Sequence, residues 1–308
     1  MNAVCPVGID AGGTRIRVAI GRPDSPERQS VYEVPSADDG GPGPLREAIA
    51  AAFSAYGKSP FEPGTRYAVC AGITKITRSG IRERWEQELR ANFHDATVSL
   101  VPDYVIAFHG AVPTGVGVCV IAGTGSVVYG ENAIGEAVRV GGRGWEYGDE
   151  GSGAHITTEL IRRTLRALDG LDEATPLTRA VVAALGTDEP SAFGEAARRT
   201  AETYGRGFLV PLVLQNAEGG DRQAKDLFVG SAGWLAAFVR AAATRLRLTN
   251  EAELPVATVG GLWQAETLLT EPFETVLRRW IPGAVVRNPQ GPPVLGAVRL
   301  ANRMVSRI

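Results

Sequence analysis

The sequence predicts an α/β fold in two parts, because one strand–loop–strand pattern occurs twice along the chain. Asp10–Thr14 (Asp-Ala-Gly-Gly-Thr) follows the apolar run Val4–Ile9, and Gly123–Ser126 (Gly-Thr-Gly-Ser) follows the apolar run Val116–Ala122. A second strand pattern comes directly after each glycine-rich loop. With 308 residues, the chain is long enough for two domains. We interpret the repeated pattern as a weak internal duplication.

The first part is predicted to have the order β-β-β-α-β-α-β. Its strands are expected at Val4–Ala11, Thr14–Gly21, Gln29–Val34, Tyr67–Ala71 and Thr97–Val101. Its helices are marked by the apolar stripes Leu45, Ile49, Phe53, Tyr56 and Ile81, Trp85, Leu89. Ser79 is the expected N-cap of the second helix. Alternation of strand and helix patterns of this kind is typical of an α/β domain.

The second part begins after a short helix expected at Tyr104–Val112. Strands are expected at Val116–Ile121, Ser126–Gly130 and Pro255–Val259, with a helix-rich region from His155 to Leu248 and a terminal helix at Val294–Val305. The first two of these strands enclose the second glycine loop and so repeat the opening arrangement of the chain.

Composition excludes several classes of protein. The net charge of −2 gives no basis for a nucleic-acid surface. His94, His109 and His155 lack metal-ligand spacing, and the three cysteines stand apart in apolar runs, which is typical of a reducing compartment. We find neither a signal-peptide pattern nor an uncharged apolar stretch of about 18 residues, and therefore expect a cytoplasmic protein without a membrane span.

Two common nucleotide-binding motifs can be tested and rejected. Gly57-Lys58-Ser59 has Ala52 where a P-loop needs glycine, and Pro60 follows it directly. The glycines around Asp10 are followed by alternating strand residues, whereas a dinucleotide fingerprint would open a helix. The Asp10–Thr14 segment is therefore expected to be a hairpin loop between two strands.

The two glycine loops are candidates for holding one polyphosphate between them. Gly12 and Gly13 permit positive φ and leave no side chain between backbone N–H groups and phosphate oxygens. Asp10, at the strand end, is placed to bind Mg²⁺ directly or through water. The alternative reading of each loop is an ordinary hairpin turn, and the pairing of the two loops favours the phosphate site.

Carboxylates mark a second kind of candidate site. Asp103 follows a strand, so it is either a helix N-cap or a general base for a substrate hydroxyl. Asp149 and Glu150 lie in a glycine-flanked loop and are costly to bury unpaired, so they are expected to face a cleft. Gly260-Gly261 ends a strand and is a suitable bed for a nucleoside, unless it serves only strand–helix packing.

The order of these motifs resembles the sugar kinase, Hsp70 and actin superfamily. Within it, the chain is most similar to N-acetylglucosamine and glucosamine kinases, grouped with BadF/BadG/BcrA/BcrD-type ATPases. The most specific match is Gly-Gly-x-Gly-x-x-x-Gly-Asp-Glu-Gly-Ser at residues 141–152, and Pro-x-x-Gly-Ala at residues 293–297 is a further match. The resemblance implies two ribonuclease H-like lobes with an ATP cleft between them: residues 1–112 joined by the helix 294–308, and residues 113–293.

The resemblance also implies roles for individual residues. Asp10 would act on Mg²⁺, and Asp103 would be the catalytic base and contact the substrate. ATP and its phosphates would be held by Gly12, Gly13, Thr14, Arg15, Gly123, Thr124, Gly125, Ser126, Gly260 and Gly261. Gly142 and Asp149 would contact the sugar. The implied activity is ATP-dependent phosphorylation of an amino-sugar hydroxyl, with a sugar and ATP as partners and a homodimer as a further option.

Departures from the family pattern leave the acceptor open. Arg143 stands where the family usually has Trp, and the family's sugar-gripping Asn is absent from the loop that here carries Asp38 and Asp39. Carboxylates there would favour a free amino sugar over an N-acetylated one, unless both are solvated loop residues. Arg143 would instead favour an acidic group on the acceptor. A partner-coupled ATPase, a kinase of another sugar or cyclitol, and an actin-like filament protein are the alternatives.

Overall fold

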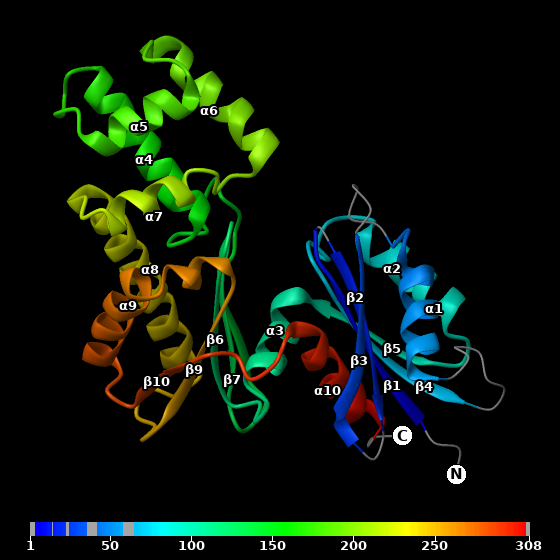
Figure 1. Cartoon of the computed structure of the whole chain (residues 1–308). Helices are drawn as coiled ribbons and strands as arrows, with labels where there is room; N and C mark the ends of the chain where they lie inside the picture. The colour runs from blue at the N-terminus through cyan, green and yellow to red at the C-terminus, as the bar shows by residue number, and fades with distance from the viewer. Residues whose placement is uncertain (1–3, 14, 23–24, 36–41, 58–64, 306–308) are drawn as a thin grey trace. The chain divides into compact units, whose positions relative to one another are not determined.

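The computed structural model describes residues 4–13, 15–22, 25–35, 42–57 and 65–305 (Figure 1). The chain divides into two compact units. Unit 1 comprises Met1–Val116 and Asn288–Ile308, and unit 2 comprises Gly117–Arg287. The chain therefore passes from unit 1 to unit 2 and returns. The boundaries expected near residues 112 and 293 are placed at Val116 and Arg287.

Unit 1 is built on a five-stranded mixed sheet of order β3-β2-β1-β4-β5. The strands are β1 Val4–Ala11, β2 Arg15–Arg22, β3 Ser25–Pro35, β4 Arg66–Ile73 and β5 Thr97–Pro102. β1, β2 and β3 are antiparallel neighbours, whereas β4 and β5 run parallel to β1. The carboxyl ends of β1, β4 and β5 therefore meet at one edge of the sheet.

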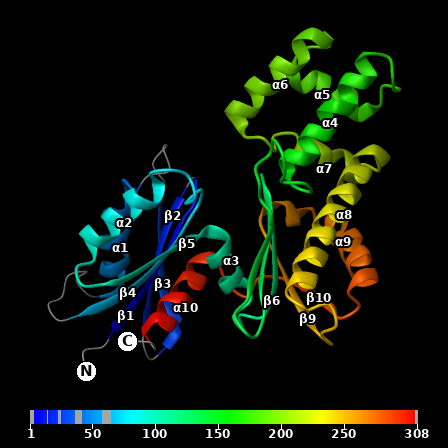
Figure 2. The same ribbon diagram turned by 180° about the vertical axis from the view of Figure 1, so that it is seen from behind.

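Helices cover both faces of this sheet. They are α1 Leu45–Tyr56, α2 Ile81–Asn92, α3 Asp103–Ala111 and α10 Pro293–Val305. One face packs on α1 and α2 through a core that includes Ile9, Phe53 and Trp85, each at most 1% exposed. α3 and α10 pack together, and α10 lies on the opposite face from α1 (Figures 1 and 2). This contact is close: a Cβ on Gly296 of α10 would lie 1.9 Å from the carbonyl oxygen of Ile106.

Unit 2 repeats the sheet of unit 1. Its strands are β6 Gly117–Ala122, β7 Ser126–Glu131, β8 Ala137–Gly141, β9 Leu254–Val259 and β10 Ala284–Arg287. Their order, β10-β9-β6-β7-β8, again places an antiparallel three-strand meander beside two parallel strands. This is the ribonuclease H-like arrangement in both units, so the predicted fold class and the internal duplication are confirmed.

The helices of unit 2 fall into two groups. α4 Gly153–Leu168, α5 Pro176–Leu185, α6 Pro190–Tyr204 and α7 Val210–Glu218 come first; α8 Arg222–Arg245, the 3₁₀ helix η1 Gly261–Ala265 and α9 Thr267–Trp280 follow. α8 is long and apolar enough to cross a membrane by length and composition alone, but half of its apolar window is buried inside the protein. Phe228, Leu235 and Val239 are completely buried, so α8 serves as a core helix packed on the sheet and α9.

Some local predictions were wrong. The N-cap of α2 is Gly80, with φ 78° and no capping side chain, so Ser79 does not cap that helix. A glycine reaches this left-handed conformation without the strain that a Cβ adds. The strands β8 and β10 were not anticipated, because each is short and lies at a sheet edge.

Candidate functional site

The hairpin loop between β1 and β2 is closed by the N–H of Gly12, which donates to the carbonyl oxygen of Arg15 at 2.9 Å. Neither Gly12 nor Gly13 takes the positive φ that a glycine permits. Two-residue type I′ turns demand positive φ at both central residues, and the loop between β1 and β2 is longer than two residues. What the glycines provide is space: a Cβ on Gly13 would meet no atom within 4 Å. Thr14, expected to contact phosphate, lies outside the described residues.

A ladder of charges crosses the three antiparallel strands of unit 1. Asp10, Arg17 and Glu33 are direct cross-strand partners in the sheet register. Arg17 Nη1 lies 3.1 Å from Asp10 Oδ2, and Arg17 Nε lies 2.6 Å from Glu33 Oε2. Arg15, predicted to bind phosphate, lies 2.5 Å from Glu33 Oε1 through its Nη1 and keeps 58% of its side chain exposed.

Asp10 is the buried end of this ladder, with 7% of the residue exposed. Burial raises the pKa of Asp10, the hydrogen bond and charge of Arg17 lower it in part, and the nearby charge of Asp103 raises it further. Arg17 and Glu33 were not among the candidate residues found from the sequence. The signal that could have found them is the β-strand register, which sets Arg17 opposite Asp10.

Asp103 is the first residue of α3, and Pro102 occupies the N-cap position without a side-chain cap. The N-cap alternative for Asp103 was therefore wrong. Thr74 Oγ1 donates to Asp103 Oδ2 at 2.8 Å, and Asp103 Oδ1 accepts from the N–H of Tyr104 at 2.9 Å. Thr74 itself is fixed, because its N–H donates to the carbonyl oxygen of Ala11 at 3.0 Å. Asp10, Thr74 and Asp103 thus stand at the carboxyl ends of three neighbouring parallel strands, where α/β sites gather.

In unit 2, the loop Gly123–Ser126 is held by the start of α4. The N–H of Gly153 donates to the carbonyl oxygen of Gly123 at 2.8 Å, and the N–H of Ala154 donates to that of Thr124 at 3.1 Å. Ser126 Oγ donates to the carbonyl oxygen of Glu150 at 2.7 Å and is buried. The hydroxyl proton of Ser126 is therefore engaged in holding the two loops together.

Asp149 links the same two loops through its side chain. Its Oδ1 accepts from the N–H of Gly144 at 3.3 Å, and a Cβ on Gly125 would lie 2.9 Å from its Oδ2. Burial raises the pKa of Asp149, and backbone hydrogen bonds from Gly144 and Ser126 counteract that rise. Glycine at position 125 is thus what lets this carboxylate approach the loop.

The segment before Asp149 is a folded loop. Gly142 has φ 65°, and a Cβ there would lie 2.9 Å from the Cβ of Val127. The guanidinium of Arg139 donates to the carbonyl oxygens of Gly141 and Gly142. The N–H of Gly148 donates to the carbonyl oxygen of Gly144 at 2.8 Å, which closes the turn. Arg143 lies at the exposed tip of this loop.

Gly260 and Gly261 adjoin the loop Gly123–Ser126. Gly260 has φ 111°, and a Cβ there would lie 2.2 Å from the carbonyl oxygen of Ala122, at the end of the parallel neighbour strand β6. A Cβ on Gly123 would lie 4.0 Å from the nitrogen of Gly261. Unit 2 therefore brings together the predicted residues at 123–126, 142–149 and 260–261.

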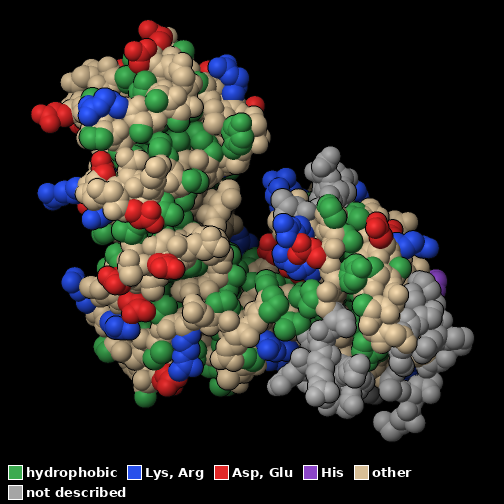
Figure 3. Space-filling model, in the orientation of Figure 1, with side chains coloured by type: hydrophobic (Ala, Val, Ile, Leu, Met, Phe, Trp, Pro, Cys, Tyr) green, Lys and Arg blue, Asp and Glu red, His purple; other side chains and the backbone are tan. Residues whose placement is uncertain are grey.

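The remaining predicted substrate residues, Asp38 and Asp39, lie outside the described residues. Within the part of the chain that the structure describes, no group of three or more His, Cys, Asp or Glu side chains could hold a metal ion. On the face shown in Figure 3, basic and acidic side chains are interspersed over both units.

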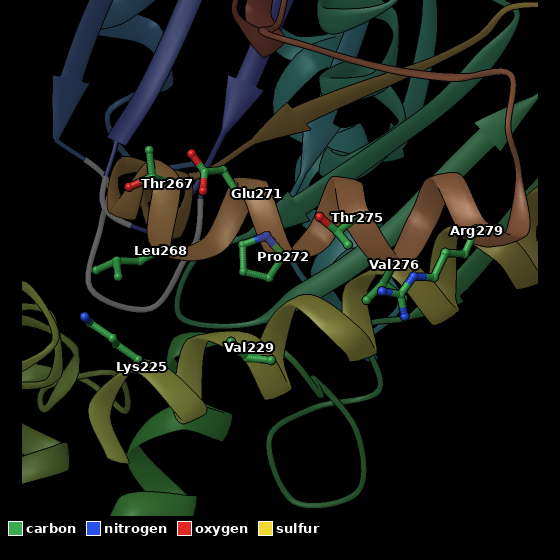
Figure 4. A pocket seen from close by; sticks show the side chains of 9 residues that line it. All are labelled: Lys225, Val229, Thr267, Leu268, Glu271, Pro272, Thr275, Val276 and Arg279. Atoms are coloured by element: carbon green, nitrogen blue, oxygen red, sulfur yellow. The ribbon is translucent and has the colours of Figure 1, made fainter. Parts of the chain in front are cut away.

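A cavity of about 530 Å³ opens between α8 and α9, lined by Lys225, Val229, Thr267, Leu268, Glu271, Pro272, Thr275, Val276 and Arg279 (Figure 4). None of the candidate residues lines this cavity.

Comparison with known proteins gives a consistent set of relatives. The chain is 27% identical over 301 residues to an N-acetylmuramic acid/N-acetylglucosamine kinase of Clostridium acetobutylicum, covering 96% of this chain and 97% of that protein. It is 26% identical over 240 residues to an N-acetyl-D-glucosamine kinase of Dictyostelium discoideum, covering 76% and 75% of the two chains.

Solved structures agree with these relatives. A candidate N-acetylglucosamine kinase from Chromobacterium violaceum superposes with a TM-score of 0.73 at 29% identity, covering 96% of this chain and 98% of that one. A ROK family glucokinase from Streptomyces griseus shares the fold, with a TM-score of 0.55 at 19% identity, covering 99% and 100% of the two chains. The family model of the BadF/BadG/BcrA/BcrD ATPases matches residues 7–301. The chain belongs to the BadF/BadG/BcrA/BcrD ATPase family.

Proposed function

We propose that this chain is an ATP-dependent kinase that phosphorylates a hydroxyl of an amino sugar of the glucosamine or N-acetylglucosamine type. The observation that carries the proposal is Asp103, a carboxylate fixed by Thr74 at 2.8 Å beside the buried Asp10. Relatives named as amino-sugar kinases, matched over three quarters of the chain or more, support the choice of acceptor.

Asp103 acts as the general base. Its carboxylate accepts the proton of the acceptor hydroxyl while that oxygen forms a bond to the γ-phosphorus of ATP and the bond to ADP breaks. Thr74 and the N–H of Tyr104 each donate to one carboxylate oxygen, which fixes the plane of the group. Each oxygen keeps lone-pair capacity for the substrate, because a carboxylate can accept about four hydrogen bonds.

Asp10 fits a role at a magnesium ion. Arg17 contacts only Oδ2 of Asp10 in the described structure, which leaves Oδ1 for the ion or its water shell. Bound Mg²⁺ would neutralise charge on the β- and γ-phosphates. Gly12, Gly13 and Arg15 border Asp10 and are placed to contact the same phosphates.

The loops of unit 2 hold the rest of the ligands in this proposal. Backbone groups of Gly123, Thr124 and Gly125 take phosphate, with Ser126 securing the loop from behind. Gly260 and Gly261 lie beside the adenosine. Gly142, Arg143 and Asp149 face the sugar. The support for this set is their convergence within unit 2 through contacts that hold Asp149 against Gly125.

The rival function is an ATPase coupled to a partner protein. A coupled assay of ADP release, with and without a panel of amino sugars, separates the two. Stimulation by an amino sugar, with phosphosugar detected by mass spectrometry, supports the kinase. Turnover that is indifferent to every sugar, including neutral hexoses and cyclitols, rejects it.

Cellular setting and assembly are part of the same proposal. Cys5, Cys70 and Cys119 are free and buried, and burial raises the pKa of Cys70 and of Cys119 to about 12. Such thiols are unreactive, which suits a reducing cytoplasm. Light scattering coupled to gel filtration distinguishes a monomer from the homodimer that the sequence allows.

A further inference from the structure

The loop between β8 and α4 is anchored at its ends and exposed at its tip. Asp149 Oδ1 accepts from the N–H of Gly144 at 3.3 Å, and the N–H of Gly148 donates to the carbonyl oxygen of Gly144 at 2.8 Å. The tip, residues 145–147, is exposed, and Tyr147 keeps 89% of its surface open to solvent. An exposed turn with few buried contacts opens easily, so a contact from outside the loop is needed to hold the tip in one position.

The linker between α6 and α7 supplies such a contact. Arg206 lies in this linker, and its Cζ is 3.6 Å from the centroid of the Trp145 ring at the loop tip. Arg206 is half-buried, and Trp145 keeps 46% of its surface exposed. A guanidinium that stacks on an indole gains cation–π attraction and restricts the orientation of both groups. The stack therefore ties the loop tip to the linker.

The same linker also packs on the helix start that holds the loop Gly123–Ser126. A Cβ on Gly207 would lie 3.6 Å from Gly153 Cα, so the two backbones are in contact. Gly153 is the first residue of α4, and its N–H donates to the carbonyl oxygen of Gly123 at 2.8 Å. The adjacent residues Arg206 and Gly207 thus connect the tip of one loop to the support of the other, entirely within unit 2.

We infer that Arg206 is a positioning residue, which through its stack on Trp145 fixes the loop at residues 142–149 relative to the loop at residues 123–126. This inference rests on the proposed function, in which the first loop faces the acceptor and the second holds the phosphates of ATP. Phosphoryl transfer requires the acceptor oxygen to lie in line with the transferred phosphorus. A misplacement of about 1 Å can cost about 10²-fold in rate, so a tie between the two loops protects the alignment. Arg206 acts through Trp145 and need not contact either substrate.

Loss of the stack should affect the acceptor and spare the nucleotide. With glucosamine and N-acetylglucosamine as acceptors for the full-length protein, Arg206→Gln should lower kcat/KM for the acceptor about 3–30-fold, the range that the strength of a cation–π contact implies. The KM for ATP should stay unchanged. Trp145→Leu should give the same loss, and the double variant should lose no more than either single variant, because all three remove one contact. Arg206→Lys and Trp145→Phe each keep part of the stack and should give smaller losses.

Hydrogen exchange of the unliganded protein gives a readout that does not depend on activity. Arg206→Gln should speed exchange in the peptide that covers residues 142–149 and leave residues 123–126 unchanged. Arg240→Gln is the matched control, because it removes a guanidinium stack between α8 and α9, where Arg240 Cζ lies 4.2 Å from the centroid of the Trp280 ring. This control should change neither the kinetics of the acceptor nor exchange at residues 142–149.

Four outcomes overturn the inference. Arg206→Gln may match Arg240→Gln in acceptor kinetics and in exchange at residues 142–149, which shows that the stack positions nothing. Additive losses in the double variant show that Arg206 and Trp145 act separately. Equal rises in KM for the acceptor and for ATP show a general loss of structure. Wild-type ADP release that no amino sugar stimulates rejects the proposed function and the inference with it, whereas the first three outcomes leave the proposed function in place.

Discussion

Arg17 should be a sensitive charged position of unit 1, because it links the buried Asp10 to the exposed Glu33. Replacing it by Gln leaves the Asp10 carboxylate without its cation, in a site where only 10% of that side chain reaches solvent. Gln is long enough to retain some packing but carries no charge. The substitution therefore tests the electrostatic contribution of the ladder more than its volume.

The expected cost follows from the exposure of the two partners. Removing one member of a fully buried ion pair costs about 3–5 kcal/mol, whereas an exposed pair contributes about 0–1 kcal/mol. Asp10 is nearly buried but 34% of the Arg17 side chain is exposed, so solvent screens the pair in part. We expect Arg17→Gln to lower the free energy of unfolding of unit 1 by about 1.5–3 kcal/mol.

Urea titration followed by hydrogen exchange of β1 and β2 peptides measures the stability of unit 1 separately from unit 2. Arg90→Gln breaks an exposed pair with Glu86 on α2 and should cost at most about 0.5 kcal/mol. Asp10→Asn should rescue part of the Arg17→Gln loss, because no charge is then left unpaired. A loss for Arg17→Gln no larger than that for Arg90→Gln, or no rescue by Asp10→Asn, would refute this account of the ladder.

Other predictions concern chemistry, pH and backbone. Asp103→Asn should lower kcat by about 10²–10⁴-fold with ATP affinity retained, and normal turnover of this variant would remove Asp103 as the base. Thr74→Val should lower kcat about 10-fold, whereas Thr74→Ser should not. Steady-state kinetics and nucleotide titration check both predictions. Because burial raises the pKa of Asp10, the folded state binds this proton more tightly than the unfolded state. The stabilisation from protonated Asp10 is present below its ordinary pKa of 3.8 and is lost as the pH rises through the raised pKa of the folded state. Magnesium-free urea titrations should therefore show a fall in the free energy of unfolding with rising pH that Asp10→Asn lacks. Gly260→Ala, whose Cβ would lie 2.2 Å from the Ala122 carbonyl oxygen, should destabilise unit 2 by more than about 2 kcal/mol in thermal unfolding, and a neutral result would exclude that clash.

Hydrophobic pattern and glycine placement were sufficient to predict the fold class. β1 and α1 lie where their apolar patterns placed them, because β1 is buried along almost its whole length and α1 buries one apolar stripe. β8 and β10 have five and four residues and lie at sheet edges, so neither carries enough periodicity to be distinguished from a loop. Long-range pairing with a neighbouring strand, which a local pattern does not encode, completes both strands.

The residues of the candidate site also divide into those that a local sequence pattern reveals and those that only the fold brings into place. Residues that are unusual in themselves, such as Asp103 and the glycines at 123, 125 and 260, could be found from sequence. Partners that act only through geometry could not, because Thr74 and Arg17 are ordinary residues until the fold sets them against Asp103 and Asp10. Gly125 shows an intermediate case: its importance was expected from a phosphate contact, and its close approach to Asp149 was not.

Asp10 and Asp103 are two carboxylates whose mutual repulsion works against the stability of the fold. Both carboxylates stand at neighbouring strand ends, and the charge of Asp103 adds to the raised pKa of Asp10. Arg17 lowers the pKa of Asp10 only in part, and Thr74 holds Asp103 by a hydrogen bond. In the proposed kinase, Asp10 would gain further compensation from a metal ion bound with the nucleotide. In the proposed kinase, a bound ligand would relieve the repulsion between the two carboxylates, which is the relation expected of a catalytic centre rather than of a structural ion pair.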